Sequence, residues 1–125
     1  SGEVEQLDPA QWQSVRQAMA LYQKAAPVVK HGHSKVFGET GASWRHPTGW
    51  QAVRRISDDG KSILLVVHTF ANAPATIEVS WPEGTWQLAG EFSESSEDAP
   101  AFSQSHITVF PAGDFEGSVF LFQCK

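Results

Sequence analysis

The stretch from Gly49 to Phe70 constrains the fold more than any other, because its pattern is that of two strands joined by a tight turn. The turn is Ser57-Asp58-Asp59-Gly60-Lys61, where Asp side chains can accept hydrogen bonds from nearby backbone N–H groups and Gly60 can adopt a positive φ. We expect the first strand from Trp50 to Ile56 and the second from Ile63 to Phe70. The second strand is apolar on both faces, with Ile63, Leu65 and Val67 on one and Leu64, Val66 and Phe70 on the other. This pattern predicts a strand in the middle of a layered structure.

An amphipathic helix is predicted before this hairpin. Asp8 fits the N-cap, Pro9 the first helical position and Gln11 the capping-box position. Pro27 is expected to end the helix, because the residue before a proline is disfavoured in the α region. The predicted helix therefore runs from Pro9 to about Ala25. Spacings of three and four predict a single apolar stripe along it, made of Trp12, Val15, Met19, Tyr22 and Ala26.

Short strands with turn residues between them follow the helix at near-regular spacing. Besides the hairpin, the predicted strands are Lys35–Phe37, Ala75–Trp81, Thr85–Phe92, Phe102–Phe110 and Gly117–Gln123. The order predicts a mainly β fold, an antiparallel β-sandwich of about six to eight strands preceded by one N-terminal α-helix. We expect two units, an N-terminal helix over residues 1–27 and the sandwich over residues 28–125.

Composition excludes several classes of function. The chain has 125 residues and a net charge of −5, with 9 Lys and Arg against 14 Asp and Glu, which disfavours a nucleic-acid surface. No apolar run approaches the roughly 20 residues that span a bilayer. A single cysteine, Cys124, rules out an internal disulfide and a cysteine-based zinc site. The start at Ser1-Gly2, without an initiator methionine, suggests a fragment, so the compartment cannot be read from this end.

Few residues suggest catalysis or metal binding. Glycoside hydrolysis needs two carboxyl groups about 5–5.5 Å or roughly 6.5–9.5 Å apart. The candidates are Asp58, Asp59, Glu91, Glu94, Glu97 and Asp98. The turn explains Asp58 and Asp59 better than catalysis does, and a solvated acidic loop explains the group from Glu94 to Asp98. His31 and His33 would share one face of an extended strand and could bind a metal with His46 as third ligand, or they are ordinary loop residues. We predict no catalytic residue, no metal and no cofactor.

The tryptophans are the best candidates for ligand binding. Trp44 and Trp50 lie close to Arg45, His46 and Gly49, and a flat aromatic face beside polar groups suits the stacking of a sugar ring. The alternative is that they serve the core, which we favour for Trp50, Trp81 and Trp86. The candidate ligand-binding residues are therefore Trp44, Trp50 and His46.

The join between helix and strands resembles the end of an α-galactosidase-like glycoside hydrolase, family 36 and its clan relatives. The resemblance rests on Leu21–Lys24, Pro27–Gly32, Trp50–Val53 and Asp59–Phe70, and as an order of elements it covers nearly the whole chain. In that family the last helix of a catalytic barrel leads into a C-terminal antiparallel sandwich. The family's catalytic aspartates lie on barrel strands, and no residue of this chain matches them.

The resemblance implies a non-catalytic C-terminal domain that supports a missing N-terminal catalytic barrel of the same protein in carbohydrate hydrolysis. One alternative is a carbohydrate-binding β-sandwich module that uses Trp44 and Trp50. Another is an immunoglobulin-like interaction domain. We also expect self-association through the apolar stripe of the helix, because one small sandwich offers little to cover it.

Overall fold

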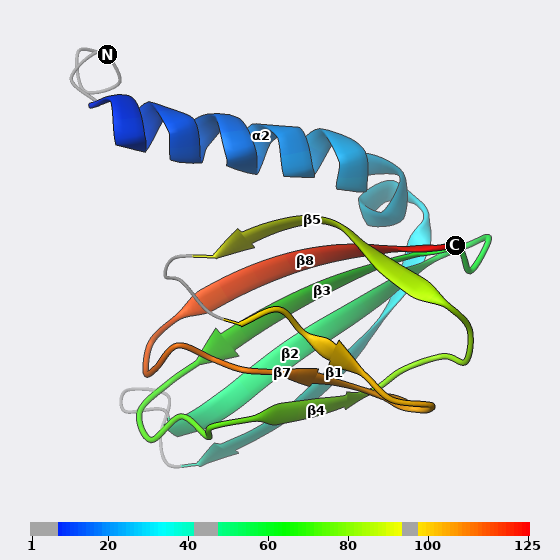
Figure 1. The fold of residues 1–125 in the computed structure, drawn as a ribbon. Helices are drawn as coiled ribbons and strands as arrows, with labels where there is room; N and C mark the ends of the chain where they lie inside the picture. Colours follow the sequence, from blue (N-terminus) through cyan, green and yellow to red (C-terminus); the bar gives the residue numbers. More distant parts are fainter. Residues whose placement is uncertain (1–7, 42–47, 94–97) are drawn as a thin grey trace.

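A computed structural model describes residues 8–41, 48–93 and 98–125, which form a helix followed by eight β-strands (Figure 1). The elements are α2 (Pro9–Lys30), β1 (Gly32–Gly41), β2 (Thr48–Ser57), β3 (Ser62–Thr69), β4 (Ile77–Ser80), β5 (Trp86–Ser93), β6 (Ala101–Phe102), β7 (His106–Val109) and β8 (Gly117–Cys124).

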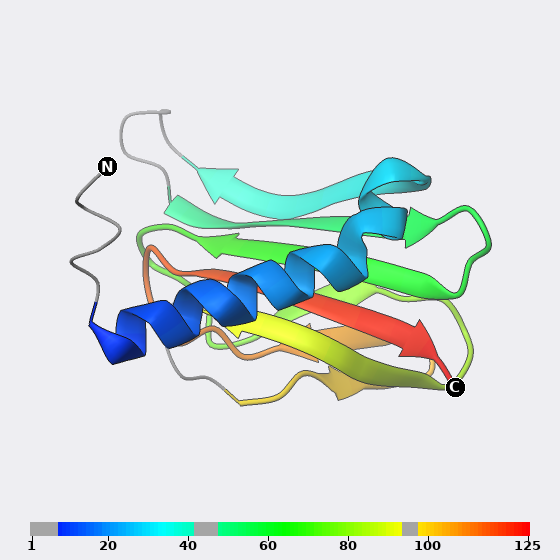
Figure 2. The same cartoon turned by 90° about the horizontal axis from the view of Figure 1, so that it is seen from above.

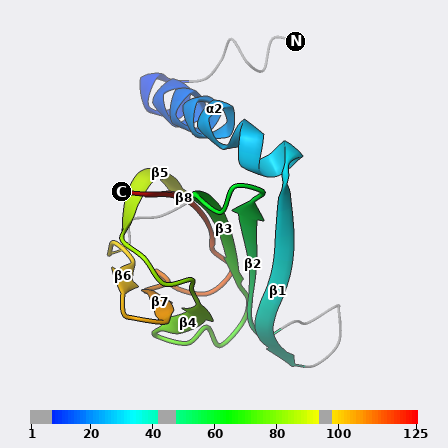
Figure 3. The same ribbon diagram turned by 90° about the vertical axis from the view of Figure 1, so that its right-hand side faces the viewer.

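The strands form two sheets that face each other. The larger has the order β1-β2-β3-β8-β5 and the smaller β4-β7-β6, and every pairing between these strands is antiparallel. The smaller sheet lies on one face of the larger sheet, and α2 lies on the other face (Figures 1 and 3). The predicted fold class, a mainly β antiparallel sandwich with one N-terminal helix, is confirmed.

The central hairpin forms as the sequence predicts. Gly60 has a φ of 71°, and its N–H donates to the Ser57 carbonyl at 2.9 Å. The Asp59 carboxylate accepts from the Ser57 hydroxyl at 2.6 Å and from the Lys61 N–H at 2.9 Å. These local bonds explain why Asp59 stands in the turn and set the register of β2 against β3.

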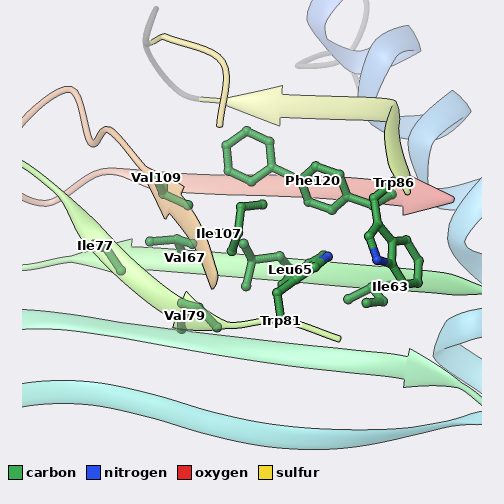
Figure 4. Packing of buried hydrophobic residues seen from close by; sticks show 12 residues of the cluster. Ile63, Leu65, Val67, Ile77, Val79, Trp81, Trp86, Ile107, Val109 and Phe120 are labelled. Atoms are coloured by element: carbon green, nitrogen blue, oxygen red, sulfur yellow. The ribbon is translucent and has the colours of Figure 1, made fainter. Parts of the chain in front are cut away.

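The main core lies between the two sheets (Figure 4). It takes Ile63, Leu65 and Val67 from β3 and Phe120 and Phe122 from β8, against residues of the smaller sheet such as Ile77, Val79, Ile107 and Val109. Leu121 points to the opposite side of β8, where it joins a second cluster with α2. Strands β3 and β8 are therefore apolar on both faces because both faces of the larger sheet are covered.

The helix uses a different face from the predicted one. Leu21, Ala25 and Val28 are its buried residues, and they pack on Leu121. Of the predicted stripe, Val15, Met19 and Tyr22 are exposed and Trp12 is half-buried. The buried face is turned roughly a third of a turn around the axis from that stripe, since 3.6 residues make one turn. Figure 2 shows α2 crossing the larger sheet diagonally.

Pro27 does not end the helix, which corrects the predicted end near Ala25. The helix continues to Lys30 because the Pro27 carbonyl accepts from the His31 N–H at 2.8 Å and the Val28 carbonyl accepts from Arg55 Nε at 2.9 Å. Pro27 cannot donate a backbone hydrogen bond and its ring crowds the preceding turn, but these contacts hold the last turn. The predicted boundary between residues 27 and 28 falls inside the helix.

The connection between helix α2 and strand β1 is very short. His31 is the single residue between α2 and β1. A Cβ added at Gly32 would stand 2.6 Å from the Ile56 carbonyl oxygen and 2.7 Å from that of Val28, so the crossing requires a glycine.

Two predicted strands differ in detail. In the predicted strand Thr85–Phe92, regular alternation would place Trp86, Leu88 and Phe92 on one side, but a bulge between Leu88 and Gly90 shifts the register. Trp86 therefore lies in the main core, while Phe92 packs with the helix cluster. The predicted strand Phe102–Phe110 is a hairpin of β6 and β7, because the Ser103 N–H donates to the His106 carbonyl at 2.9 Å and turns the chain.

Candidate functional site

The predicted ligand-binding residues are only partly placed. Trp44 and His46 lie outside the described residues. Trp50 lies on β2, half-buried, and packs against the main core together with Phe37 and Ile56. Trp81 and Trp86 are buried in that core, as expected for structural tryptophans.

A cationic and aromatic cluster lies beside Trp50 on the same face of β1 and β2. The Arg54 guanidinium carbon is 5.1 Å from the centre of the Phe37 ring, and Lys35 Nζ is 5.3 Å from it. Alternation along β2 places Trp50, Ala52, Arg54 and Ile56 on one face, and Phe37 stands opposite Ala52 in the register. A signal for this cluster is present in the apolar residues two apart on β2, with Arg54 among them. Phe37, however, lies in a segment expected to hold only a short strand.

Arg54 also ties the two sheets together. Its Nη1 donates to the Ser80 carbonyl at 2.5 Å and to the Ser80 hydroxyl at 2.9 Å, so it holds β2 against the end of β4. Burial lowers the pKa of Arg54, and a guanidinium remains charged even so. Its buried Nε has no hydrogen-bond partner among the described residues. This arrangement can hold the Phe37 ring in place.

The carboxylates of the hairpin have structural partners. Asp58 Oδ1 lies 3.3 Å from His33 Nε2, and both side chains are exposed, at 61% and 86%. Ser57, and then the Lys61 N–H, hold the pKa of Asp59 below its usual value. Glu91 and Asp98 are exposed, and Glu94 and Glu97 lie outside the described residues. The turn interpretation of Asp59 is confirmed.

The histidines are not gathered around a metal site in the described part of the chain. His31 follows the helix, and its carbonyl accepts from the Asp58 N–H at 3.0 Å, while the His33 ring meets Asp58. Within residues 8–41, 48–93 and 98–125, no group of three or more His, Cys, Asp or Glu side chains is placed to hold a metal ion.

An apolar surface accompanies the helix. We call Val15, Met19 and Tyr22 the helix flank; Met19 is 59% exposed and Tyr22 66%. Beside it lies a groove of about 170 Å³ with an almost wholly apolar lining. Its residues are Ala18, Leu21, Tyr22, Ala25 and Val29 of the helix and Leu64, Phe92 and Val119 of the sheet. The flank and the groove together form an apolar surface suited to a protein contact.

No helix in the described residues combines the length and the apolar character that a membrane crossing requires. Comparison with protein-family models, with curated proteins and with solved structures found no match to this chain. The fold and the surfaces therefore carry the functional argument.

Proposed function

We propose that this chain is the non-catalytic C-terminal domain of an α-galactosidase-type glycoside hydrolase, in which it supports the catalytic barrel. The observation that carries the proposal is the helix flank. One side of α2 is buried on its own sheet through Leu21, Ala25 and Val28, while Val15, Met19 and Tyr22 remain exposed on an adjoining side. A helix with two apolar sides suits a position between two bodies.

Burying the helix flank against another domain would lower the free energy. Apolar surface removed from water contributes about 25 cal/mol per Å². Outer helices of a barrel bury one side on the barrel strands, so a barrel would gain this contribution at the flank. The single-residue join at His31 would hold sandwich and helix in a fixed relation, which suits a supporting role better than a flexible tether.

The first test uses the longer protein that carries this chain. We expect barrel-like βα repeats with strand-end aspartates upstream of Ser1, and α-galactosidase activity in the whole protein. A Met19→Glu and Tyr22→Glu double variant should lower the thermal midpoint of the whole protein, because it places charge in the barrel contact. Ala20→Glu is the matched control, since Ala20 is exposed and outside the flank. An upstream sequence without such repeats, or equal midpoints for the two variants, contradicts the proposal.

The second test uses the chain alone. Without the barrel aspartates it should release no aryl group from aryl α- or β-galactosides and glucosides. Turnover that disappears on replacing Asp58, Asp59 or Glu91 would place catalysis inside this chain and overturn the non-catalytic role.

Carbohydrate binding is the second candidate, and the cluster around Phe37 favours it. An aromatic ring with Arg54 and Lys35 beside it, and Trp50 on the same face, combines stacking surface with N–H donors. Millimolar galactose or an oligosaccharide should then quench indole fluorescence saturably, and Trp50→Phe and Trp44→Phe should show which indole responds. If the unaltered chain shows no saturable response, carbohydrate binding is excluded and the supporting role is the remaining candidate.

A further inference from the structure

We propose that strand β1 is the docking edge for a second copy of this chain, which pairs with it antiparallel about a two-fold axis at Phe37. The proposal goes beyond the supporting role, because it uses a surface other than the helix flank.

The two edges of the larger sheet differ in their protection. Strand β5 carries a bulge, and it lies against α2, where Lys24 Nζ donates to the Ala89 carbonyl at 3.3 Å. Strand β1 pairs with β2 along its whole length, from Gly32 to Gly41, without a shift of register. No described strand pairs with its other side, and Figure 3 shows it at the outer edge, far from β5. A long uninterrupted edge presents unpaired N–H and C=O groups to any strand that fits.

The charges on β1 are unbalanced in a single copy. Lys35 stands opposite Arg54 in the β1/β2 register, and like charges directly opposite each other disfavour the pairing. Both cations lie over the Phe37 ring, which offsets part of this repulsion. Across the described residues, no ion pair includes Lys35 or Glu39. Among the described residues, Lys35 therefore has no anionic partner and Glu39 has no cationic one.

A second copy supplies both neighbours at once. When Phe37 stands opposite the partner's Phe37, Lys35 stands opposite the partner's Glu39, and Glu39 stands opposite the partner's Lys35. Residues two apart share a face, so both ion pairs lie on the same face as the aromatic pair. A shift by two residues in either direction loses both ion pairs, and a shift by one turns the matching side chains to opposite faces.

These complementary charges favour a second copy of this chain as the partner at the edge of β1. The pairing is isologous, because each copy offers the same strand in the same register, so it closes as a dimer and does not extend into a fibre. The two larger sheets then form one continuous sheet with Arg54, Lys35 and the partner's Glu39 in a row. The edge that is unprotected in one copy becomes the centre of the dimer.

The test is sedimentation of the chain over roughly 1 μM to 1 mM, the range of weak to moderate affinities. The unaltered chain should dimerise, and Lys35→Glu should weaken the association constant about tenfold or more, because it sets two acids opposite each other. Glu39→Lys should do the same, and the double charge swap should restore the dimer. Glu91→Lys on β5 is the matched control and should leave association unchanged. Circular dichroism of each variant checks that the sandwich remains folded.

Restoration by the double swap, with loss in each single variant, supports the β1 pairing. A chain that stays monomeric up to about 1 mM overturns the proposal, since that concentration corresponds to a very weak contact. A dimer that is indifferent to both charge reversals also overturns it. A dimer abolished by Met19→Glu but kept by Lys35→Glu overturns it in favour of association through the helix flank. None of these results bears on activity of the longer protein, so this proposal and the supporting role fail separately.

Discussion

At the scale of single residues, Trp81 and Trp86 are structural tryptophans of the main core. Trp81 and Trp86 meet edge to face with ring centres 6.1 Å apart, and Trp86 Nε1 donates to the Pro82 carbonyl at 3.2 Å. Trp81 also packs edge to face on Phe122 at 5.1 Å. Such contacts need one fixed position for each ring. The core role of Trp81 could be predicted because Ile77, Val79 and Trp81 alternate with polar residues.

The core of β3 gives the first prediction. Leu65 has 0% exposure, so Leu65→Ala should lower the free energy of unfolding by about 2–5 kcal/mol through lost burial and a cavity. Leu88→Ala is the matched control, because Leu88 is 38% exposed, and its effect should be clearly smaller. Urea unfolding of both variants measures the difference. Equal losses for the two leucines would contradict the assignment of β3 to the middle of the sandwich.

The turn gives a prediction about pH. The folded pKa of Asp59 lies below its ordinary value of 3.8, first through the Ser57 hydroxyl and then through the Lys61 N–H. A depressed folded pKa contributes stability that is complete above the unfolded pKa and is lost as pH falls through the folded pKa. Asp59→Asn should therefore be less stable than the unaltered chain at neutral pH, and the two should converge in strong acid. Unfolding curves measured from neutral pH to acid test this, and a gap that widens in acid would contradict it.

At the scale of elements, helix α2 shows that hydrophobic periodicity alone does not identify which face of a helix is buried. Val15, Met19 and Tyr22 have helical spacing, and so do Leu21, Ala25 and Val28 on the neighbouring side. Both stripes satisfy the same pattern, and only the sheet selects one of them. Leu64, Val119 and Leu121 lie on the outer face of strands β3 and β8 and meet the second stripe. The start of the helix was predictable because its capping box is local: Asp8 Oδ1 accepts from the Gln11 N–H at 2.8 Å.

The two stripes differ in their expected response to truncation. Leu21→Ala should cost about 2–5 kcal/mol in the free energy of unfolding, because Leu21 is buried between helix and sheet. Met19→Ala should change it by only about 0.5 kcal/mol or less, since exposed positions contribute little. Denaturant midpoints of the two variants distinguish the stripes. A larger loss for Met19 would mean that the helix packs on the sheet through the stripe that the sequence predicted.

At the scale of the whole molecule, the sequence predicted the layers of the fold better than it predicted the details of the edge strands. Strands apolar on both faces indicated a covered central sheet, and the covers are α2 and the smaller sheet. The bulge at Leu88 and Gly90 was not predictable, because it depends on how β5 meets β8. The cluster of Phe37, Lys35 and Arg54 was missed for the same reason, since it needs the register of β1 against β2. Trp44 and His46 remain predictions.

The last prediction concerns whether helix and sandwich unfold together. Leu21, Ala25 and Val28 share a cluster with Leu121, and Leu121 lies between Phe120 and Phe122 on β8, which belong to the main core. Strand β8 thus contributes side chains to both clusters. Unfolding of the sandwich therefore removes the sheet on which the helix packs. We expect a single cooperative transition, with the helical signal in circular dichroism and the tryptophan fluorescence sharing one midpoint. The measurement is best made in Trp12→Phe, which leaves no tryptophan on the described helix. A helical signal that melts at a lower temperature than the fluorescence would mean that residues 1–27 form a separate unit, as the sequence-based partition predicts.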